Sequence, residues 1–268
     1  MKDLQKNINE APIGIFDSGL GGLSICREIV NLMPNESIVY LADSKNAPYG
    51  EKSKNEIIKL SVKNVELLLE MGCKIIVVAC NTATTNAISE LRSSFDVPII
   101  GIEPATKPAA LQTKSGKIGV LATEGTLKSE LFLSTSEQFR DSLEIIEVKG
   151  IGLVRLIESG RIEETEVLLK EYLYPLVQKG VDNIVLGCTH YPFLIPIIKK
   201  VIPESITIID SGAAVAKQTQ LILGENNRLN NKSDNSSKCF YTNKDIKIFK
   251  RFISEIELKS KEVSYKEF

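Results

Sequence analysis

IGIFDSGLGG, residues 13–22, begins the first strand–turn–helix unit of this 268-residue chain. Ile13 to Phe16 predict a buried strand, and the glycine-rich turn that starts at Asp17 leads into a helix over residues 23–32. A second Asp-Ser-Gly turn, at Asp210, again follows an apolar run and precedes a helical pattern. Units of this kind predict parallel sheets, because a strand that is followed by a helix usually crosses back to the same sheet.

The alternation of short apolar runs with longer helical patterns continues along the chain. It predicts strands at residues 13–16, 38–42, 75–79, 97–101, 118–122, 143–148, 184–187, 206–209 and 239–242, and helices at 23–32, 51–71, 84–95, 127–139, 163–179, 192–201, 213–223 and 245–259. Segment 224–238 holds five asparagines and three serines and predicts an exposed loop. With a length that suits about two domains, the chain is expected to be an α/β protein with two similar three-layer domains and mostly parallel sheets.

Composition limits the classes of partner. The 33 Lys and Arg residues nearly balance the 34 Asp and Glu residues, so the net charge of −1 argues against a nucleic-acid or membrane-surface binder. No apolar run reaches the length of a membrane-spanning helix, and Met1 to Glu10 are too polar for a secretory signal. Five cysteines without such a signal indicate a cytoplasmic protein with reduced thiols.

Two cysteines stand in matching positions. Cys80 in Ala-Cys-Asn-Thr and Cys188 in Gly-Cys-Thr-His each follow a strand and precede a helix. Ligands bind at the carboxyl ends of parallel strands, and a helix N-terminus lowers the pKa of a nearby thiol. Either cysteine could instead be a small buried apolar residue, but two in the same context favour chemistry. Cys26, Cys73 and Cys239 lack this context and are interpreted as structural, and no cysteine spacing suits a metal.

Polar residues at the same strand ends are candidate partners of the thiols. His190, the sole histidine, lies two residues after Cys188 and could hold or move a proton, although it could also be a buried polar group. Asp17 is the acidic counterpart on the side of Cys80, or else a turn residue before glycine. Asn81 and Thr82 suit helix caps. The run Gly19 to Gly22 does not fit a dinucleotide fingerprint.

Two thiols in matching positions limit the kinds of reaction that the site could catalyse. Acid and base groups on opposite faces of one carbon suit removal of a proton from one side and its return on the other, which is racemisation or epimerisation. A hydrolase that uses Cys188 with His190 is the alternative enzyme class, but it gives Cys80 no role. A binding protein that has lost turnover is the third hypothesis, and it gives neither thiol a role.

Several motifs resemble those of the glutamate racemases, and they follow one another in that family's order over nearly the whole chain. They are GIFDSGLGGL at 14–23, PYG at 48–50, ACNTA at 79–83, ATEGT at 122–126, GCTHYP at 187–192 and DSG at 210–212. Aspartate racemases share the two-cysteine layout but lack this full set of loops. If the chain is a racemase of this family, the alternative to glutamate racemase is an aspartate or other amino-acid racemase.

The resemblance implies an enzyme that interconverts L- and D-glutamate without a cofactor or metal and supplies D-glutamate for peptidoglycan. It places the two bases at Cys80 and Cys188, assisted by Asp17 and His190, with Cys188 acting on L-glutamate and Cys80 on D-glutamate. The substrate-binding positions it implies are Asp17, Ser18, Pro48, Tyr49, Gly50, Asn81, Thr82, Thr123, Thr189 and His190. It also implies a cytoplasmic homodimer whose partner is the small-molecule substrate, with no nucleic acid and no membrane.

The family fold has two α/β domains with the active site in the cleft between them, and the C-terminal segment completes the first domain. This implies a first domain of residues 12–101 plus 210–268 and a second of residues 102–209. One stretch departs from the family pattern: a Cys-Pro pair that many relatives carry is replaced in the run from Val148 to Glu158. Glu158 keeps an acidic position but stays outside the predicted site.

Overall fold

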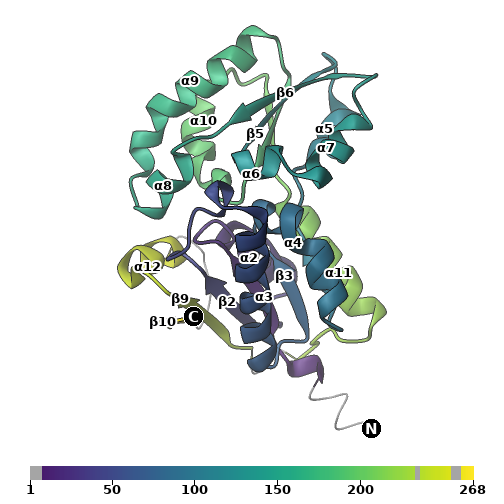
Figure 1. Ribbon diagram of the computed structural model, residues 1–268, viewed down its shortest axis with the longest axis vertical. Coiled ribbons are helices and arrows are strands. Elements are labelled where there is room, and N and C mark those ends of the chain that lie inside the picture. Colours follow the sequence, from purple (N-terminus) through teal and green to yellow (C-terminus); the bar gives the residue numbers. More distant parts are fainter. Residues whose placement is uncertain (1–7, 233–235, 255–260) are drawn as a thin grey trace.

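The computed structural model describes residues 8–232, 236–254 and 261–268 (Figure 1). Two separate sheets organise the chain, one of six strands in the lower half of Figure 1 and one of four strands in the upper half. Every strand pair in both sheets is parallel. The predicted α/β class with mostly parallel sheets is therefore confirmed.

The six-stranded sheet has the order β10-β9-β2-β1-β3-β4. Its strands are β1 (Ile13–Asp17), β2 (Ile38–Ala42), β3 (Ile75–Val78), β4 (Ile99–Gly101), β9 (Lys238–Thr242) and β10 (Lys261–Tyr265). All five residues of β1 are buried, as is typical of a central parallel strand. The sheet thus joins the first hundred residues to the last thirty.

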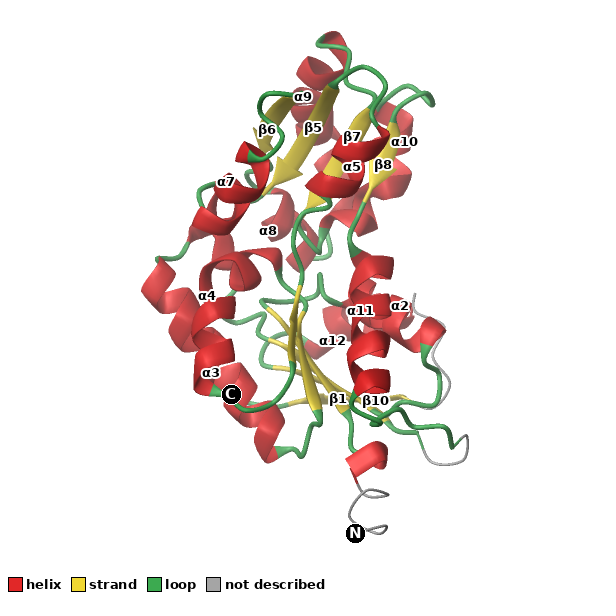
Figure 2. Ribbon diagram, turned by 90° about the vertical axis from the view of Figure 1, so that its right-hand side faces the viewer, coloured by secondary structure: helices red, strands yellow, loops and turns green. Residues whose placement is uncertain are grey.

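Helices cover both faces of this sheet, as Figure 2 shows from the side. The helices α2 (Leu23–Leu32), α11 (Gly212–Glu225) and α12 (Ile246–Ser254) cover one face, and α3 (Lys54–Glu70) and α4 (Asn81–Ser94) cover the other. Side chains alternate between the two layers: Ile75 and Val77 of β3 face the first layer, and Ile76 and Val78 face the second. This period of two gives the sheet an apolar surface on both faces.

The four-stranded sheet has the order β6-β5-β7-β8 and is likewise covered on both faces. Its strands are β5 (Lys117–Ala122), β6 (Glu144–Lys149), β7 (Asn183–Gly187) and β8 (Thr207–Ile209). One face is covered by α5 (Thr106–Gln112), α6 (Glu124–Leu127) and α7 (Glu130–Glu137). The other face is covered by α8 (Leu153–Glu158), α9 (Thr165–Gln178) and α10 (Ile195–Val201). The chain also forms three short 3₁₀ turns, η1 (Tyr49–Glu51), η2 (Ile162–Glu164) and η3 (Tyr191–Leu194).

One buried apolar cluster continues from α2, α11 and α12 to α8, α9 and α10. Phe252 of α12 packs edge-on against Phe193 of η3, with ring centroids 5.0 Å apart. The two halves therefore share part of their core. The predicted domain bounds, 12–101 plus 210–268 and 102–209, fall between the two sheets and stay a prediction.

Several predicted elements differ from the structure. The helix expected at 127–139 is two helices, α6 and α7, because the Ser129 hydroxyl accepts the N–H of Phe132 and starts a new helix. The helix expected from Thr84 begins three residues earlier, at Asn81. The strand β10 and the short helices α5 and α8 were not predicted, and the part of the C-terminal helix expected at 255–259 lies outside the described residues.

Most of the described residues of segment 224–238 are exposed, as predicted, but part of the segment covers a buried ion pair. Lys74 and Glu36 form an ion pair of 2.6 Å whose side chains are each 1% exposed. The same Lys74 ammonium donates to the carbonyl of Arg228, and the N–H of Asn230 donates to Glu36. The described part of this segment is thus hydrogen-bonded to a buried ion pair. Within the described ranges, no helix has the length and apolar character needed to cross a membrane.

Candidate functional site

The carboxyl ends of strands from both sheets meet at one small cavity of about 10 Å³. Residues from the first sheet's side and from the second's line it together: Ser18, Pro48, Tyr49, Gly50, Cys80, Asn81, Thr82, Thr123, Val154, Cys188, Thr189 and His190. Eleven of these twelve were predicted from the sequence, and Val154 was not. The two thiols, 108 positions apart in the chain, therefore belong to one site.

Cys80 caps the helix α4. Its Sγ accepts the N–H of Ala83 at 3.4 Å and lies 3.5 Å from the Ser18 hydroxyl. The prediction that Asn81 and Thr82 cap this helix is wrong, because both already lie in its first turn. Burial raises the pKa of the Cys80 thiol, and the negative charge of Asp17 raises it further. The expected lowering by the helix N-terminus is therefore outweighed.

Cys188 follows β7 directly and lies beside the histidine. Its Sγ is 3.8 Å from Nδ1 of His190. The chain continues into the 3₁₀ turn η3 before α10 starts, so this thiol does not cap an α-helix as Cys80 does. Both cysteines are nearly fully buried. The matching sequence contexts thus lead to two different local environments.

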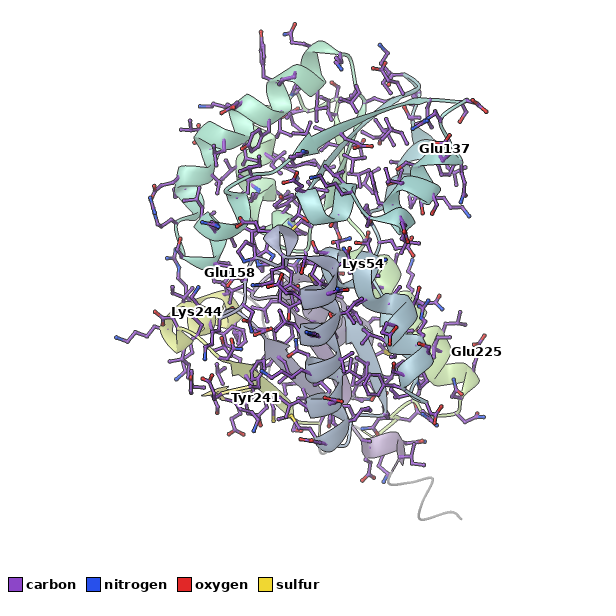
Figure 3. The ribbon with its side chains drawn as sticks, in the orientation of Figure 1. Lys54, Glu137, Glu158, Glu225, Tyr241 and Lys244 are labelled. Atoms are coloured by element: carbon purple, nitrogen blue, oxygen red, sulfur yellow. The ribbon has the colours of Figure 1, made fainter. Side chains whose placement is uncertain are left out.

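His190 is held on its other side by a carboxylate that was left out of the predicted site. Its Nε2 lies 2.6 Å from Glu158 Oε1, and both side chains are buried. Figure 3 shows Glu158 at the level where the two halves of the molecule meet. Burial by itself would lower the pKa of His190, but its hydrogen bonds to Cys188 and Glu158 raise it well above the ordinary value. The imidazole is therefore favoured in its charged form.

The glycine-rich turn after β1 packs against this pair. A Cβ on Gly19 would lie 1.9 Å from Glu158 Oε1, and one on Gly21 would lie 2.3 Å from Nδ1 of His190. Between them, the N–H of Leu20 donates to Glu158 Oε1 at 2.6 Å. The turn that did not fit a dinucleotide fingerprint thus needs glycine so that its backbone can approach the histidine and the carboxylate.

Asp17 lies directly behind the cavity wall. It accepts the N–H of Gly19 at 2.9 Å and the hydroxyl of Thr189 at 3.2 Å, so it links the two halves. Burial raises its pKa; His190 acts in the opposite direction, and Glu158 adds to the rise. Among the predicted residues Asp17 alone does not line the cavity, and it acts on Cys80 through its charge.

The two residues after Cys80 differ in their bonding. Both polar atoms of the Asn81 amide are buried without a hydrogen-bond partner among the described residues. The hydroxyl of Thr82 lies 2.8 Å from that of Thr123, across the two halves. A buried amide without partners is costly, so Asn81 is the side chain of this site best placed to receive a polar ligand.

The phenol of Tyr49 is already used within the protein. Its O–H donates to Asp43 at 2.6 Å and accepts the amide of Asn64 at 3.1 Å. Tyr49 lines the cavity, as expected for a predicted substrate-binding residue, but its hydroxyl has two partners elsewhere. The turn Pro48 to Gly50 therefore faces the cavity with its backbone and the ring.

The remaining cysteines fit their structural interpretation. Burial raises the pKa of Cys26 and of Cys73 to about 12, which makes both thiols inert near neutral pH. Cys239 is half-buried in β9. Among the residues that the structure describes, no three His, Cys, Asp or Glu side chains are grouped so that they could hold a metal ion.

Glu158 and Val154 are the site residues that sequence reasoning missed. Both lie on α8, a six-residue helix that was not predicted. The one available signal was the acidic position of Glu158 in the family pattern, because its contact with His190 spans 32 positions of sequence.

Comparisons with known proteins agree on one family. The model of the family described as Asp/Glu/Hydantoin racemase matches residues 13–219. A glutamate racemase of Ectopseudomonas mendocina is 50% identical over 226 residues, which cover 83% of this chain and 86% of that relative.

Solved structures agree with the sequence relatives. A glutamate racemase isoform of Bacillus anthracis superposes with a TM-score of 0.86 at 32% identity, covering 97% of this chain and 98% of that chain. The Escherichia coli glutamate racemase, in complex with L-glutamate and the activator UDP-MurNAc-Ala, has a TM-score of 0.84 at 32% identity, with 95% and 98% covered.

Proposed function

Because this chain belongs to the Asp/Glu/Hydantoin racemase family, we propose that it interconverts L-glutamate and D-glutamate with two cysteine thiols as base and acid. The observation that carries the proposal is the placement of Cys80 and Cys188 on one small cavity, each with its own buried polar partner. A hydrolase that uses Cys188 and His190 would give the buried Cys80 no role.

The proposed reaction is a proton exchange at one carbon. The thiolate on one face accepts the α-proton, and the electron pair of the broken C–H bond moves into the neighbouring carboxylate. The thiol on the other face donates its proton to the same carbon, so the configuration inverts and the two sulfurs exchange protonation states. Each thiol is the base for one enantiomer.

The polar groups around each thiol support this assignment. His190, whose pKa is raised, lies 3.8 Å from Cys188, and we assign it as the partner of that thiol in the reaction. On the opposite side, burial and then the negative charge of Asp17 raise the pKa of Cys80 and hold that thiol protonated, ready to donate. A protonated Cys80 is placed to act as the acid and leaves Cys188 as the base, which by the family pattern is the direction that starts from L-glutamate.

Recognition of the amino acid is assigned to groups on both halves. The first turn of α4, with Asn81 and Thr82, presents N–H groups and a positive dipole end that suit a carboxylate. The Asn81 amide, which has no partner among the described residues, supplies both a donor and an acceptor. Thr123, Thr189 and the turn Pro48 to Gly50 complete the proposed contacts.

The remaining parts of the proposal follow the family. The L-glutamate bound in the Escherichia coli neighbour supports the choice of glutamate over aspartate. We further propose that the enzyme needs no cofactor or metal, since the chain supplies both thiol groups, and that it works as a cytoplasmic homodimer providing D-glutamate for peptidoglycan.

One experiment tests the proposed reaction directly. Purified protein is incubated with L-glutamate in deuterated water after dialysis against a chelator. We expect optical inversion together with one deuterium at the α-carbon, without added pyridoxal phosphate. Faster turnover of aspartate would move the assignment to an aspartate racemase, and inversion that requires a restored metal or pyridoxal phosphate would overturn the two-thiol reaction.

A further inference from the structure

The catalytic cavity is too small for its proposed substrate. Its volume of about 10 Å³ is roughly that needed for a single water. A second cavity of about 230 Å³ adjoins it and shares four wall residues with it, namely Pro48, Gly50, Thr123 and Val154. The walls of the small cavity therefore have to separate for glutamate to enter, and the outer cavity offers an adjoining route.

An ion pair lies at the wall of the outer cavity. Glu51 directly follows Tyr49 and Gly50 of the site, and Arg155 directly follows Val154. The guanidinium of Arg155 donates two hydrogen bonds to the Glu51 carboxylate, from Nε to Oε1 at 3.0 Å and from Nη2 to Oε2. Glu51 lies on η1, in the chain of the six-stranded sheet, and Arg155 lies on α8, in the chain of the four-stranded sheet. The pair therefore joins the two halves.

We propose that the Arg155–Glu51 pair is a latch at the entrance of the site, and that Arg155, once released, receives a carboxylate of the incoming substrate. This inference rests on the proposed function, because it takes a dicarboxylic amino acid as the ligand. Arg155 is a positioning residue for substrate entry and has no part in proton transfer.

The chemistry of the pair suits such an exchange. A guanidinium binds carboxylates in a planar, two-pronged geometry, so the substrate can take the place of Glu51 with the same contacts. The side chains of Arg155 and Glu51 are 66% and 51% exposed, and an exposed ion pair holds only weakly. The latch can therefore open often.

The same helix connects the latch to the catalytic histidine. Glu158, which binds His190 at 2.6 Å, lies one helical turn after Arg155 on α8. Its carboxylate also accepts the N–H of Leu20 from the other half. When α8 moves away from η1, Glu158 moves with the helix that carries it, and closure restores its bonds to His190 and to Leu20 whether or not the latch is intact.

Access to the two thiols tests the latch without any turnover. The full chain is alkylated with neutral iodoacetamide and with anionic iodoacetate, and labelling of the peptides with Cys80 and Cys188 is followed by mass spectrometry. The variants are Glu51→Gln, Arg155→Gln and the control Arg161→Gln. Arg161 forms a similar exposed pair with Glu164, which lies outside the outer cavity. Labelling of buried Cys26 reports general unfolding.

We expect the neutral reagent to label both thiols about 2- to 5-fold faster in Glu51→Gln and in Arg155→Gln, the scale for loss of an exposed pair, with Arg161→Gln unchanged. The ratio of anionic to neutral labelling, which cancels changes in thiolate fraction, should rise in Glu51→Gln and fall in Arg155→Gln. Neutral rates that match the unmodified chain overturn the latch, and equal ratios in the two variants overturn anion capture.

Kinetics then separate this inference from the proposed function. For Arg155→Gln we expect a higher KM for glutamate with little change in kcat, because the residue acts on entry only. A fall in kcat at constant KM would overturn the assigned role of Arg155. If labelling behaves as expected but the unmodified chain does not racemise glutamate, the proposed function fails while the gated entrance stands.

Discussion

His190 Nε2 lies 2.6 Å from Oε1 of Glu158, in a pair of side chains that are both buried. A charge-assisted hydrogen bond of this length fixes the imidazole plane and favours its protonated form. The opposite nitrogen, Nδ1, is thereby directed at Cys188 Sγ. The orientation of the imidazole beside this thiol is thus set by a carboxylate on the other side of the ring.

Replacing the carboxylate should lower the proton affinity of the histidine. In Glu158→Gln we expect the pKa of His190 to fall from its raised value, because one of the two hydrogen bonds that raise it loses its charge. As His190 is the sole histidine, NMR of the imidazole nitrogens follows it without ambiguity. We expect kcat to fall about 10- to 100-fold, the scale for a hydrogen bond to a charged group.

This pair also makes stability depend on pH. The raised pKa of folded His190 means that its contribution is fully present below its ordinary unfolded value, about 6.5, and is lost as pH rises through the folded value. The free energy of unfolding of the unmodified chain relative to Glu158→Gln should therefore be largest in mild acid. A difference that grows toward alkaline pH would contradict the charged pair.

Substituting each thiol by serine should abolish racemisation but leave half of the chemistry. The surviving thiol can still remove a proton from the enantiomer that faces it, and a glutamate analogue with a β-leaving group reports this by elimination. We expect Cys80→Ser and Cys188→Ser to eliminate from opposite enantiomers. Two variants with the same enantiomeric preference would refute the two-thiol reaction, and a fully active Cys80→Ser would favour the hydrolase.

Removing the charge of Asp17 should make Cys80 more acidic. The Asp17 carboxylate raises the pKa of this thiol, so Asp17→Asn should shift the pH profile of Cys80 alkylation by iodoacetamide to lower pH. Peptide mass spectrometry separates this thiol from the others. A shift to higher pH would mean that Asp17 acts on Cys80 by some route other than its charge.

A methyl group on the glycine-rich turn should disturb the histidine. In Gly21→Ala the new Cβ would lie 2.3 Å from Nδ1 of His190, and we expect a loss of about 1–3 kcal/mol in unfolding free energy. Misplacing a catalytic group by about 1 Å can cost roughly 10²-fold in rate, so kcat should fall on that scale. Gly224→Ala is the control, since its Cβ meets only Leu229 at 3.6 Å and should preserve activity.

Breaking the buried ion pair should test the anchoring of segment 224–238. Lys74→Met leaves Glu36 buried without its cation, and breaking such a pair costs about 3–5 kcal/mol. The exposed pair of Lys170 and Glu166 offers the control Lys170→Met, with an expected cost of about 0–1 kcal/mol. Denaturant titrations measure the free energy of unfolding of both variants. Equal losses would show that the buried Lys74 pair stabilises the fold no more than the exposed pair does.

Local sequence patterns were sufficient to predict the strand ends and the two thiols. Buried parallel strands are continuous apolar runs, and the residues that follow them must gather at the carboxyl edge of the sheet. This rule, together with the resemblance to a family, predicts that Cys80, Cys188 and the residues beside them lie at one site.

Other features depend on contacts that no local pattern contains. Glu158 reaches His190 and the N–H of Leu20 only because α8 packs at the junction of the two halves. The phenol of Tyr49 is turned to Asp43 and Asn64, and the burial that raises the pKa of Cys80 depends on the tertiary packing around it. The strand β10, with charged residues in its first two positions, has too weak a pattern to be distinguished from a tail.

The order of strands in the larger sheet has a consequence for synthesis on the ribosome. Strands β5 to β8 are contiguous in the chain and can pair as soon as residue 209 has emerged, whereas β2 acquires its neighbour β9 only after residue 242. Until then the nascent chain carries an open edge along Ile38–Ala42, and such edges recruit other chains. The half that is translated first is therefore completed last, and a message truncated before β9 yields a product prone to aggregate.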